Sequence, residues 1–168
     1  MLVCRLQVCQ FKMIILGIDP GFARMGWGVI SKTGPKFSLI DYGCLETSSE
    51  SDLADRQEMI FDGISKVIKK YKPDLAGVET LFFNTNAKTA VKVGEARGVI
   101  LLALKKSGIK STDLTPLQVK QAVSGYGRAE KSQVQKMVKA LLNLKQIPRP
   151  DDAADALAVA LAAGSTRL

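Results

Sequence analysis

Apolar and polar residues follow two different periods along the chain, and together they predict a mixture of strands and helices. Short apolar runs bounded by turn residues predict five strands, at residues 13–19, 25–31, 36–46, 75–79 and 111–115. Apolar residues at helical spacing predict five helices, at residues 51–71, 86–106, 116–123, 129–142 and after 150. This order predicts an α/β fold with a five-stranded mixed sheet, antiparallel on one side, parallel on the other and flanked by helices.

The length of 168 residues suits one compact domain. Residues 1–12, MLVCRLQVCQFK, are mildly apolar, but polar residues interrupt them and no cleavage site follows, which is atypical of a signal peptide. We predict one domain over residues 13–168, preceded by a leader that is either an added strand or the result of an early start codon. No run reaches the roughly 18 apolar residues of a membrane span, so a cytoplasmic protein without a membrane partner is expected.

The residue types exclude several kinds of chemistry. The chain has no histidine, so Ser-His and Cys-His nucleophiles and imidazole-bound metals are excluded. Its three cysteines form no CxxC pair, which argues against a zinc site or a disulfide framework. The net charge of +8 is carried entirely by residues 105–149, while residues 1–104 carry +2 and residues 150–168 carry −2. This concentration favours a polyanionic partner over a merely solvated surface.

Two carboxylates close predicted strands. Asp19 ends the run IILGID before Pro20-Gly21, and Glu79 ends LAGVE. If these two strands are neighbours, both carboxylates lie at the crevice beyond the carboxyl ends of the strands, where ligands bind in open α/β sheets. A turn-forming role is the alternative, stronger for Asp19 than for Glu79.

The segment RPDDAADALAVA, residues 149–160, predicts a further acidic group. Asp152 and Asp155, or equally Asp151 and Asp155, share one face of a helix. Capping of the helix explains Asp151 well and Asp155 poorly. The surrounding alanines allow the helix to lie close to the sheet, which would bring Asp155 toward Asp19. No basic residue follows on this helix before Arg167, so no local cationic partner is expected.

Four carboxylates in a protein without histidine point to a hard divalent cation. Mg²⁺ takes oxygen ligands and is commonly held by a few carboxylates together with substrate phosphate. Two such ions about 4 Å apart stabilise both the attacking water and the leaving oxygen of a phosphoryl displacement. The acidic group and the basic stretch together predict hydrolysis of a nucleic-acid phosphodiester.

Four segments resemble the RuvC family of crossover-junction (Holliday junction) endodeoxyribonucleases: residues 17–21 (GIDPG), 77–99, 125–138 and 150–160. The resemblance extends from Met13 to about Ala163. It implies an RNase H-like fold and a homodimer that uses two Mg²⁺ per subunit, or Mn²⁺. It also implies symmetric nicks in two strands of like polarity of a four-way DNA junction, leaving 5′-phosphates, during recombination and DNA repair. The RuvA–RuvB branch-migration complex is the implied partner.

The resemblance also implies roles for single residues. Asp19, Glu79, Asp152 and Asp155 match the catalytic, metal-binding acids, although the family varies between Asp and His at the position of Asp152 and Asp151 stands beside it. Three further residues match DNA-contacting positions of the family: Phe82, Lys120 and Lys131. An aromatic ring at Phe82 or Phe83 would stack on unpaired bases, with a core position as the alternative, and lysines would hold phosphates.

Two glycines bear on how one of the predicted helices packs. Gly94 and Gly98 lie four apart in a predicted helix that the resemblance assigns to the dimer interface, with packing against the sheet as the alternative.

DPGFARMGWGV is similar to the phosphate turn of actin-like phosphotransferases, which need two domains that 168 residues do not supply. A DNA-binding module without catalysis is disfavoured because all four acids are present.

Overall fold

The computed structural model describes residues 11–80 and 87–166. Its five strands, the number that the sequence predicted, form one sheet in the order β3-β2-β1-β4-β5. They are β1 (Lys12–Asp19), β2 (Arg24–Thr33), β3 (Lys36–Glu46), β4 (Leu75–Glu79) and β5 (Lys110–Leu114). The first three strands run antiparallel to one another, and β4 and β5 continue the sheet parallel to β1. The prediction of an α/β fold with a mixed sheet is confirmed.

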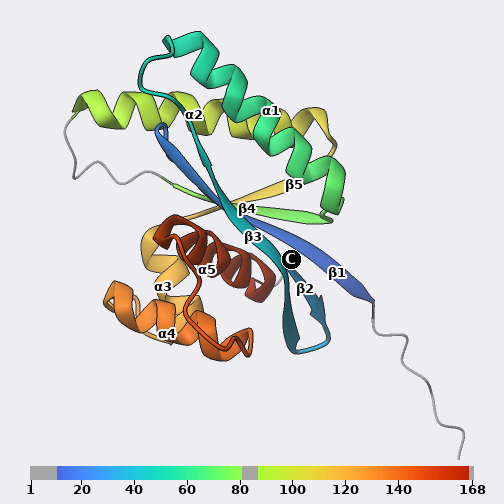
Figure 1. Ribbon diagram of the computed structural model, residues 1–168. Coiled ribbons are helices and arrows are strands. Elements are labelled where there is room, and N and C mark those ends of the chain that lie inside the picture. The colour runs from blue at the N-terminus through green and yellow to red at the C-terminus, as the bar shows by residue number, and fades with distance from the viewer. Residues whose placement is uncertain (1–10, 81–86, 167–168) are drawn as a thin grey trace, which may run out of the picture.

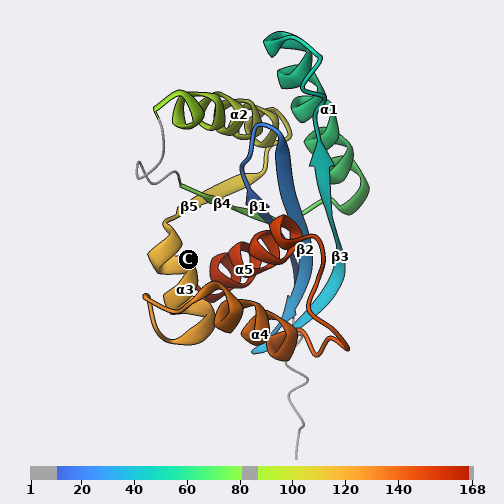
Figure 2. The same cartoon turned by 60° about the vertical axis from the view of Figure 1, so that its left-hand side comes forward.

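Helices cover both faces of this sheet (Figure 1). On one face lie α1 (Leu53–Tyr71) and α2 (Ala87–Lys106), and on the other lie α3 (Pro116–Ser124), α4 (Lys131–Leu141) and α5 (Asp151–Ser165). Figure 2, turned by 60°, shows α5 between the sheet and the α3–α4 pair. Each face has its own apolar core, one against α1 and α2 and the other around α5.

Local sequence signals set where the helices begin. The side chain of Asp52 accepts a hydrogen bond from the Asp55 backbone N–H and caps α1. Thr115 and Gln118 form a capping box at the start of α3, where Pro116 occupies the first helical position. These signals explain why the observed helices begin within one or two residues of their predicted positions.

Glycines in the sheet allow α5 to lie directly against the strands. A Cβ atom on Gly17 would overlap the Ala156 carbonyl oxygen, and one on Gly26 would overlap the Asp152 carbonyl oxygen. The alanines of α5 complete this close approach, because Ala153, Ala156 and Ala160 are fully buried. The predicted contact of the alanine-rich helix with the sheet is therefore present.

Small differences from the predicted elements have local causes. The predicted helix at residues 129–142 begins at Lys131 in the structure, because Glu130 adopts an extended conformation as its N-cap residue. Strand β1 starts at Lys12, one residue before the predicted domain boundary, and residues 1–10 lie outside the described part of the chain. Within residues 11–80 and 87–166, no helix has the length and apolar character needed to cross a membrane.

Candidate active site

The sheet register brings the two strand-ending acids together. Strands β1 and β4 are parallel neighbours, with Ile18 paired to Val78, so Asp19 and Glu79 leave the sheet side by side. Their carboxyl groups are close enough to share a hydrogen bond. The condition on which the sequence argument depended, that these strands are neighbours, is met.

Helix α5 adds its carboxylates to this pair. Burial, followed by the charges of Glu79, Asp155 and Asp152, raises the pKa of Asp19 from 3.8 to about 8. Burial also raises the pKa of Glu79, with a further contribution from the charge of Asp155, while Lys120 and Lys131 act in the opposite direction. The carboxylates of β1, β4 and α5 thus form one electrostatic cluster, in which each negative charge disfavours the others.

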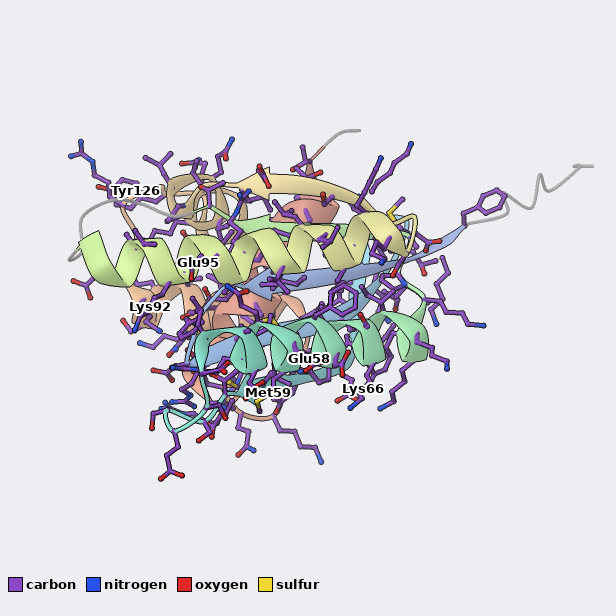
Figure 3. The ribbon with its side chains drawn as sticks, turned by 90° about the horizontal axis from the view of Figure 1, so that it is seen from above. Glu58, Met59, Lys66, Lys92, Glu95 and Tyr126 are labelled. Atoms are coloured by element: carbon purple, nitrogen blue, oxygen red, sulfur yellow. The ribbon has the colours of Figure 1, made fainter. Side chains whose placement is uncertain are left out.

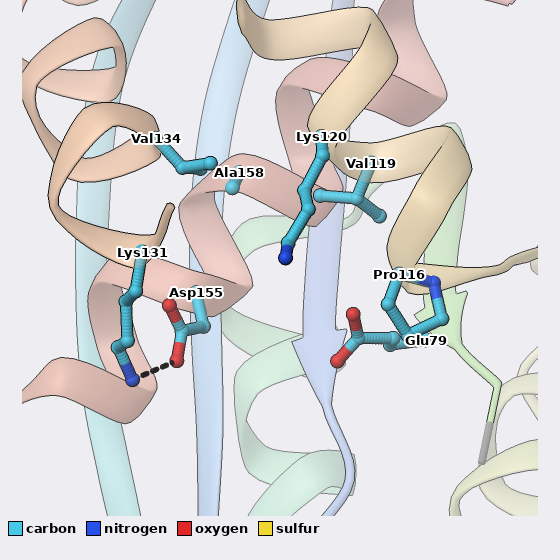
Figure 4. Close-up of a pocket in the computed structure, with 8 residues that line it drawn as sticks. All are labelled: Glu79, Pro116, Val119, Lys120, Lys131, Val134, Asp155 and Ala158. Atoms are coloured by element: carbon cyan, nitrogen blue, oxygen red, sulfur yellow. Dashed lines mark hydrogen bonds and ion pairs between the residues drawn. The ribbon is translucent and has the colours of Figure 1, made fainter. Parts of the chain in front are cut away.

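A pocket of about 230 Å³ opens beside this cluster. Glu79 and Asp155 line it together with Lys120 of α3 and Lys131 of α4 (Figure 4). In that view the Lys120 ammonium points toward the space between the two carboxylates. Apolar side chains of Val119 and Val134 form part of the remaining wall. Two lysines predicted to contact DNA therefore lie at the candidate acids.

Asp155 has a cationic partner, contrary to the sequence-based expectation for this helix. Lys131 Nζ donates a hydrogen bond of 2.6 Å to Asp155 Oδ2 and lies 3.9 Å from Asp151 Oδ2. Although partial burial acts to lower it, the pKa of Lys131 is raised, because the hydrogen bond and charge of Asp155 favour the ammonium. Burial raises the pKa of Asp155 against the opposing effect of Lys131.

The other two acids of α5 also have basic partners. Arg24 Nη2 lies 3.4 Å from Asp152 Oδ2, and Arg149 Nη1 donates to Asp151 Oδ1 at 2.5 Å. The expectation of no local partner was wrong because it considered only residues following on the same helix. Arg149 precedes the helix, while Arg24 and Lys131 come from distant elements that the fold brings to it.

The structure also distinguishes Asp151 from Asp152. The charge of Asp152 is one of the main causes that raise the pKa of Asp19, and the charge of Asp151 is not among those main causes. Both charges raise the pKa of Asp155. Asp152 is therefore the better candidate for the fourth member of the cluster, and Asp151 lies toward its rim with Arg149.

The donor set of this cluster fits a hard divalent cation in ligand type and charge. All four acids offer oxygen, which Mg²⁺ and Mn²⁺ prefer, and their mutual repulsion favours a cation among them. Among the described residues, however, no three acidic, histidine or cysteine side chains already stand close enough to enclose a metal ion. Asp155 and Asp152 are instead paired with Lys131 and Arg24. Binding of a metal would require Asp155 to exchange its ammonium partner for the ion.

Sequence reasoning reached most of this site and missed part of it. Arg24 was not recognised, although its place at the start of β2 follows from the antiparallel pairing that puts Gly26 beside Asp19. Phe82, predicted to contact DNA, lies outside the described residues, as does its neighbour Phe83.

Comparisons with known proteins agree with this geometry. A family described as "Crossover junction endodeoxyribonuclease RuvC" matches residues 15–163. The protein of that name from Halothermothrix orenii is 56% identical over 154 residues, which cover 92% of this chain and 93% of the relative. The Thermus thermophilus RuvC structure matches with a TM-score of 0.85 at 36% identity, covering 91% of this chain and 94% of that one. A structure of T. thermophilus RuvC in complex with Holliday junction substrate also has a TM-score of 0.85, at 38% identity, covering 89% and 92%.

Proposed function

The chain belongs to the RuvC family of crossover junction endodeoxyribonucleases, and we propose that it resolves four-way DNA junctions by paired, metal-dependent hydrolytic nicks. The single observation that carries this proposal is the convergence of Asp19, Glu79, Asp152 and Asp155 from two strand ends and one helix. The relative from T. thermophilus is known in complex with Holliday junction substrate. The proposed products are 5′-phosphates and 3′-hydroxyls, in recombination and DNA repair.

The four acids would hold two Mg²⁺ ions, for which Mn²⁺ could substitute. Bound there, these ions would make water a stronger nucleophile and stabilise negative charge on the reacting phosphate. Burial removes water from around the acids. It also raises the pKa of Asp19 to about 8 in the absence of a cation. A carboxyl so disfavoured as an anion gains most from a nearby dication.

The lysines would position the substrate. Lys120 points toward the space between Glu79 and Asp155, where its ammonium would bind a non-bridging oxygen of the phosphate (Figure 4). Lys131, once released from Asp155, would bind the backbone of the same strand. Neither contact reads the base sequence. Phe82 remains the proposed stacking residue for an unpaired base.

A homodimer would supply the second nick. Val91, Gly98 and Leu102 share one outward face of α2, since they are spaced by seven and four residues. Val91 is 61% exposed and Leu102 53% exposed, and nothing in residues 11–80 or 87–166 lies within 4 Å of a Cβ atom built on Gly98. Gly98 therefore does not serve packing against the sheet, which supports the alternative that a second copy covers this face. The RuvA–RuvB complex is the proposed partner on the junction.

Cleavage of a synthetic four-way junction tests the proposed function. We expect Mg²⁺ to support two symmetric nicks in strands of like polarity, with no cleavage of a linear duplex of the same sequence and none in EDTA. Equal cleavage of the linear duplex would contradict junction selectivity. Absence of cleavage under all divalent-metal conditions, by protein that binds the junction, would favour the non-catalytic alternative.

A further inference from the structure

A second pocket is lined by the turn that follows Asp19 and shares no lining residue with the pocket that holds Lys120. It has a volume of about 480 Å³. Backbone of the turn at residues 21–23 forms one wall, and the remaining lining residues are Arg24, Arg56, Lys92 and Val93. Three of these are basic and none is acidic. The four acids and two lysines of the candidate site do not line this pocket, and its link to them is the pairing of Arg24 with Asp152.

Arg56 is fixed at this pocket by neutral groups alone. Its Nε donates a hydrogen bond of 2.9 Å to Thr47 Oγ1, and its Nη2 lies 3.4 Å from the Phe22 carbonyl oxygen. The guanidinium also stacks on the buried Phe22 ring, with its carbon 3.9 Å from the ring centroid. These contacts use two of the five N–H donors of a guanidinium. Arg56 is thus held in place with donors and its full charge left over.

Lys92 adds a second cation next to Arg56. Its Nζ lies 5.7 Å from the centroid of the same Phe22 ring. Within residues 11–80 and 87–166, neither Lys92 nor Arg56 takes part in an ion pair. Two like charges on one aromatic ring repel each other unless an anion lies between them. A planar guanidinium and a mobile ammonium are the donors that proteins use for phosphate.

The second pocket lies next to the acid cluster, which bears on the kind of anion that it would bind. It begins two residues after Asp19, and Arg24 lies both in its wall and 3.4 Å from Asp152. The two pockets share no lining residue: Lys120 and Lys131 line the first, and Arg56 and Lys92, from helices on the opposite face of the sheet, line the second. A strand with one phosphate at the acids carries neighbouring phosphates in both directions. Lys120 and Lys131 belong to the first pocket, so a neighbouring phosphate at the second pocket would meet Arg56 and Lys92 instead.

We propose that Arg56 and Lys92 form a second phosphate subsite, which binds the DNA backbone of the cleaved strand beside the phosphate held at the acids. This inference rests on the proposed nuclease function. Arg56 supplies a rigid, oriented contact, and Lys92 supplies a mobile charge. Together with the lysines of the first pocket, they fix the strand on both sides of the reacting phosphate.

The test measures how binding of a synthetic four-way junction depends on salt in EDTA, where the proposed metal-dependent cleavage does not proceed. The main variant is Lys92→Gln, because Lys92 is exposed and takes part in no ion pair among the described residues. We expect the slope of log K against log salt to become less steep by about 0.9. Accordingly, the ratio of variant to wild-type Kd should be about 3-fold larger at 50 mM than at 200 mM salt.

Lys66→Gln is the matched control. Lys66 is also exposed and lies on α1, away from the pocket, and Figure 3 shows it well separated from Lys92. This variant should leave both Kd and slope unchanged. The double variant Arg56→Gln, Lys92→Gln should make the salt slope less steep by about 1.8, the value for two phosphate contacts. Its circular dichroism spectrum should be unchanged. If Lys92→Gln keeps the wild-type slope, or if Lys66→Gln changes it equally, the subsite is wrong.

Failure of the subsite and failure of the proposed function are separable. Wild-type protein that cleaves the junction while Lys92→Gln binds with an unchanged slope would refute only the subsite. Wild-type protein that binds but does not cleave with any divalent metal would refute the nuclease proposal. Inorganic phosphate is the remaining probe: protection of wild type but not Lys92→Gln against thermal unfolding, without a change in the junction slope, would mean a small-anion site and would overturn the DNA assignment.

Discussion

Asp19 is buried beside three other carboxylates, and both its burial and their charges disfavour its ionised form. Without a bound cation, Asp19 therefore keeps its proton well above the usual pH. Its pKa of about 8 in the folded chain compares with 3.8 for an unperturbed carboxyl. For Asp155 and Asp152, ion pairs with Lys131 and Arg24 offset the repulsion between the neighbouring carboxylates. At the residue scale, ionised Asp19 therefore lowers the free energy of unfolding when no cation is bound, and a cation bound among these acids would remove that loss.

The pH dependence of stability tests this property of Asp19. Between pH 3.8 and about 8 the unfolded chain has lost the proton that the folded chain retains, so rising pH favours the unfolded state. Asp19→Asn removes this penalty. In EDTA at pH 8 we expect the variant to unfold at a temperature about 2–4 °C higher, corresponding to about 1 kcal/mol, with a smaller difference at pH 4. A variant less stable than wild type at pH 8 would mean that Asp19 supports the fold.

Lys131 is expected to contribute one phosphate contact despite its pairing with Asp155. We predict that Lys131→Ala weakens junction binding and makes its salt slope less steep by about one, measured by electrophoretic mobility shift in a divalent metal under conditions where the junction is not cleaved. Lys66→Ala, which removes an exposed lysine of α1, should change neither quantity. An unchanged slope for Lys131→Ala would exclude this lysine from the DNA interface.

At the scale of elements, the position of α5 against β1 and β2 builds the site. Gly26 allows this contact because a side chain there would overlap the Asp152 carbonyl oxygen. The place of Asp19 and Glu79 at strand ends was predictable, since strand ends follow from apolar runs, whereas their arrangement side by side depended on the condition that β1 and β4 are neighbours, which the structure supplies. The pairing of Arg24 with Asp152, and of Lys131 with Asp155, was not predictable, because it depends on how strand β2 and helix α4 pack around α5 and not on local spacing.

Gly26→Ala tests the contact of α5 with the sheet. The added methyl group must displace α5 backbone, so we expect the free energy of unfolding to fall by about 1–3 kcal/mol and junction cleavage to decrease. Urea unfolding measures the first effect. Gly98→Ala is the control, because its Cβ would meet nothing within 4 Å in the part of the chain that the structure describes and alanine favours a helix by about 1 kcal/mol. Equal stability of Gly26→Ala and wild type would contradict the close approach of α5.

At the scale of the whole molecule, the two faces of the sheet have different tasks. On one face, α3, α4 and α5 carry Lys120, Lys131 and the acids of α5, while on the opposite face α1 and α2 carry Arg56 and Lys92 of the second pocket (Figures 1 and 2). The outer face of α2 is free to meet a second copy, which would relate two active sites by a two-fold axis and match the symmetry of two nicks.

Leu102→Glu tests this dimer. A charge placed on the outer face of α2 should shift the protein from dimer to monomer in sedimentation velocity and reduce paired nicking, without lowering the stability of the monomer. Leu117→Glu on α3 is the matched control, because Leu117 is 57% exposed and Leu102 is 53% exposed. Dissociation by both variants, or by neither, would remove α2 as the interface.

The central claim is that acids from separate elements act together on one phosphate of a DNA junction. Its most direct test is single-turnover cleavage of a four-way junction in Mg²⁺ by Asp155→Asn, alongside Asp62→Asn, an equivalent change at an exposed position of α1. The account predicts that Asp155→Asn binds the junction in EDTA within a few-fold of wild type but cleaves it at least about 100-fold more slowly, whereas Asp62→Asn does both normally. Wild-type cleavage by Asp155→Asn would contradict it.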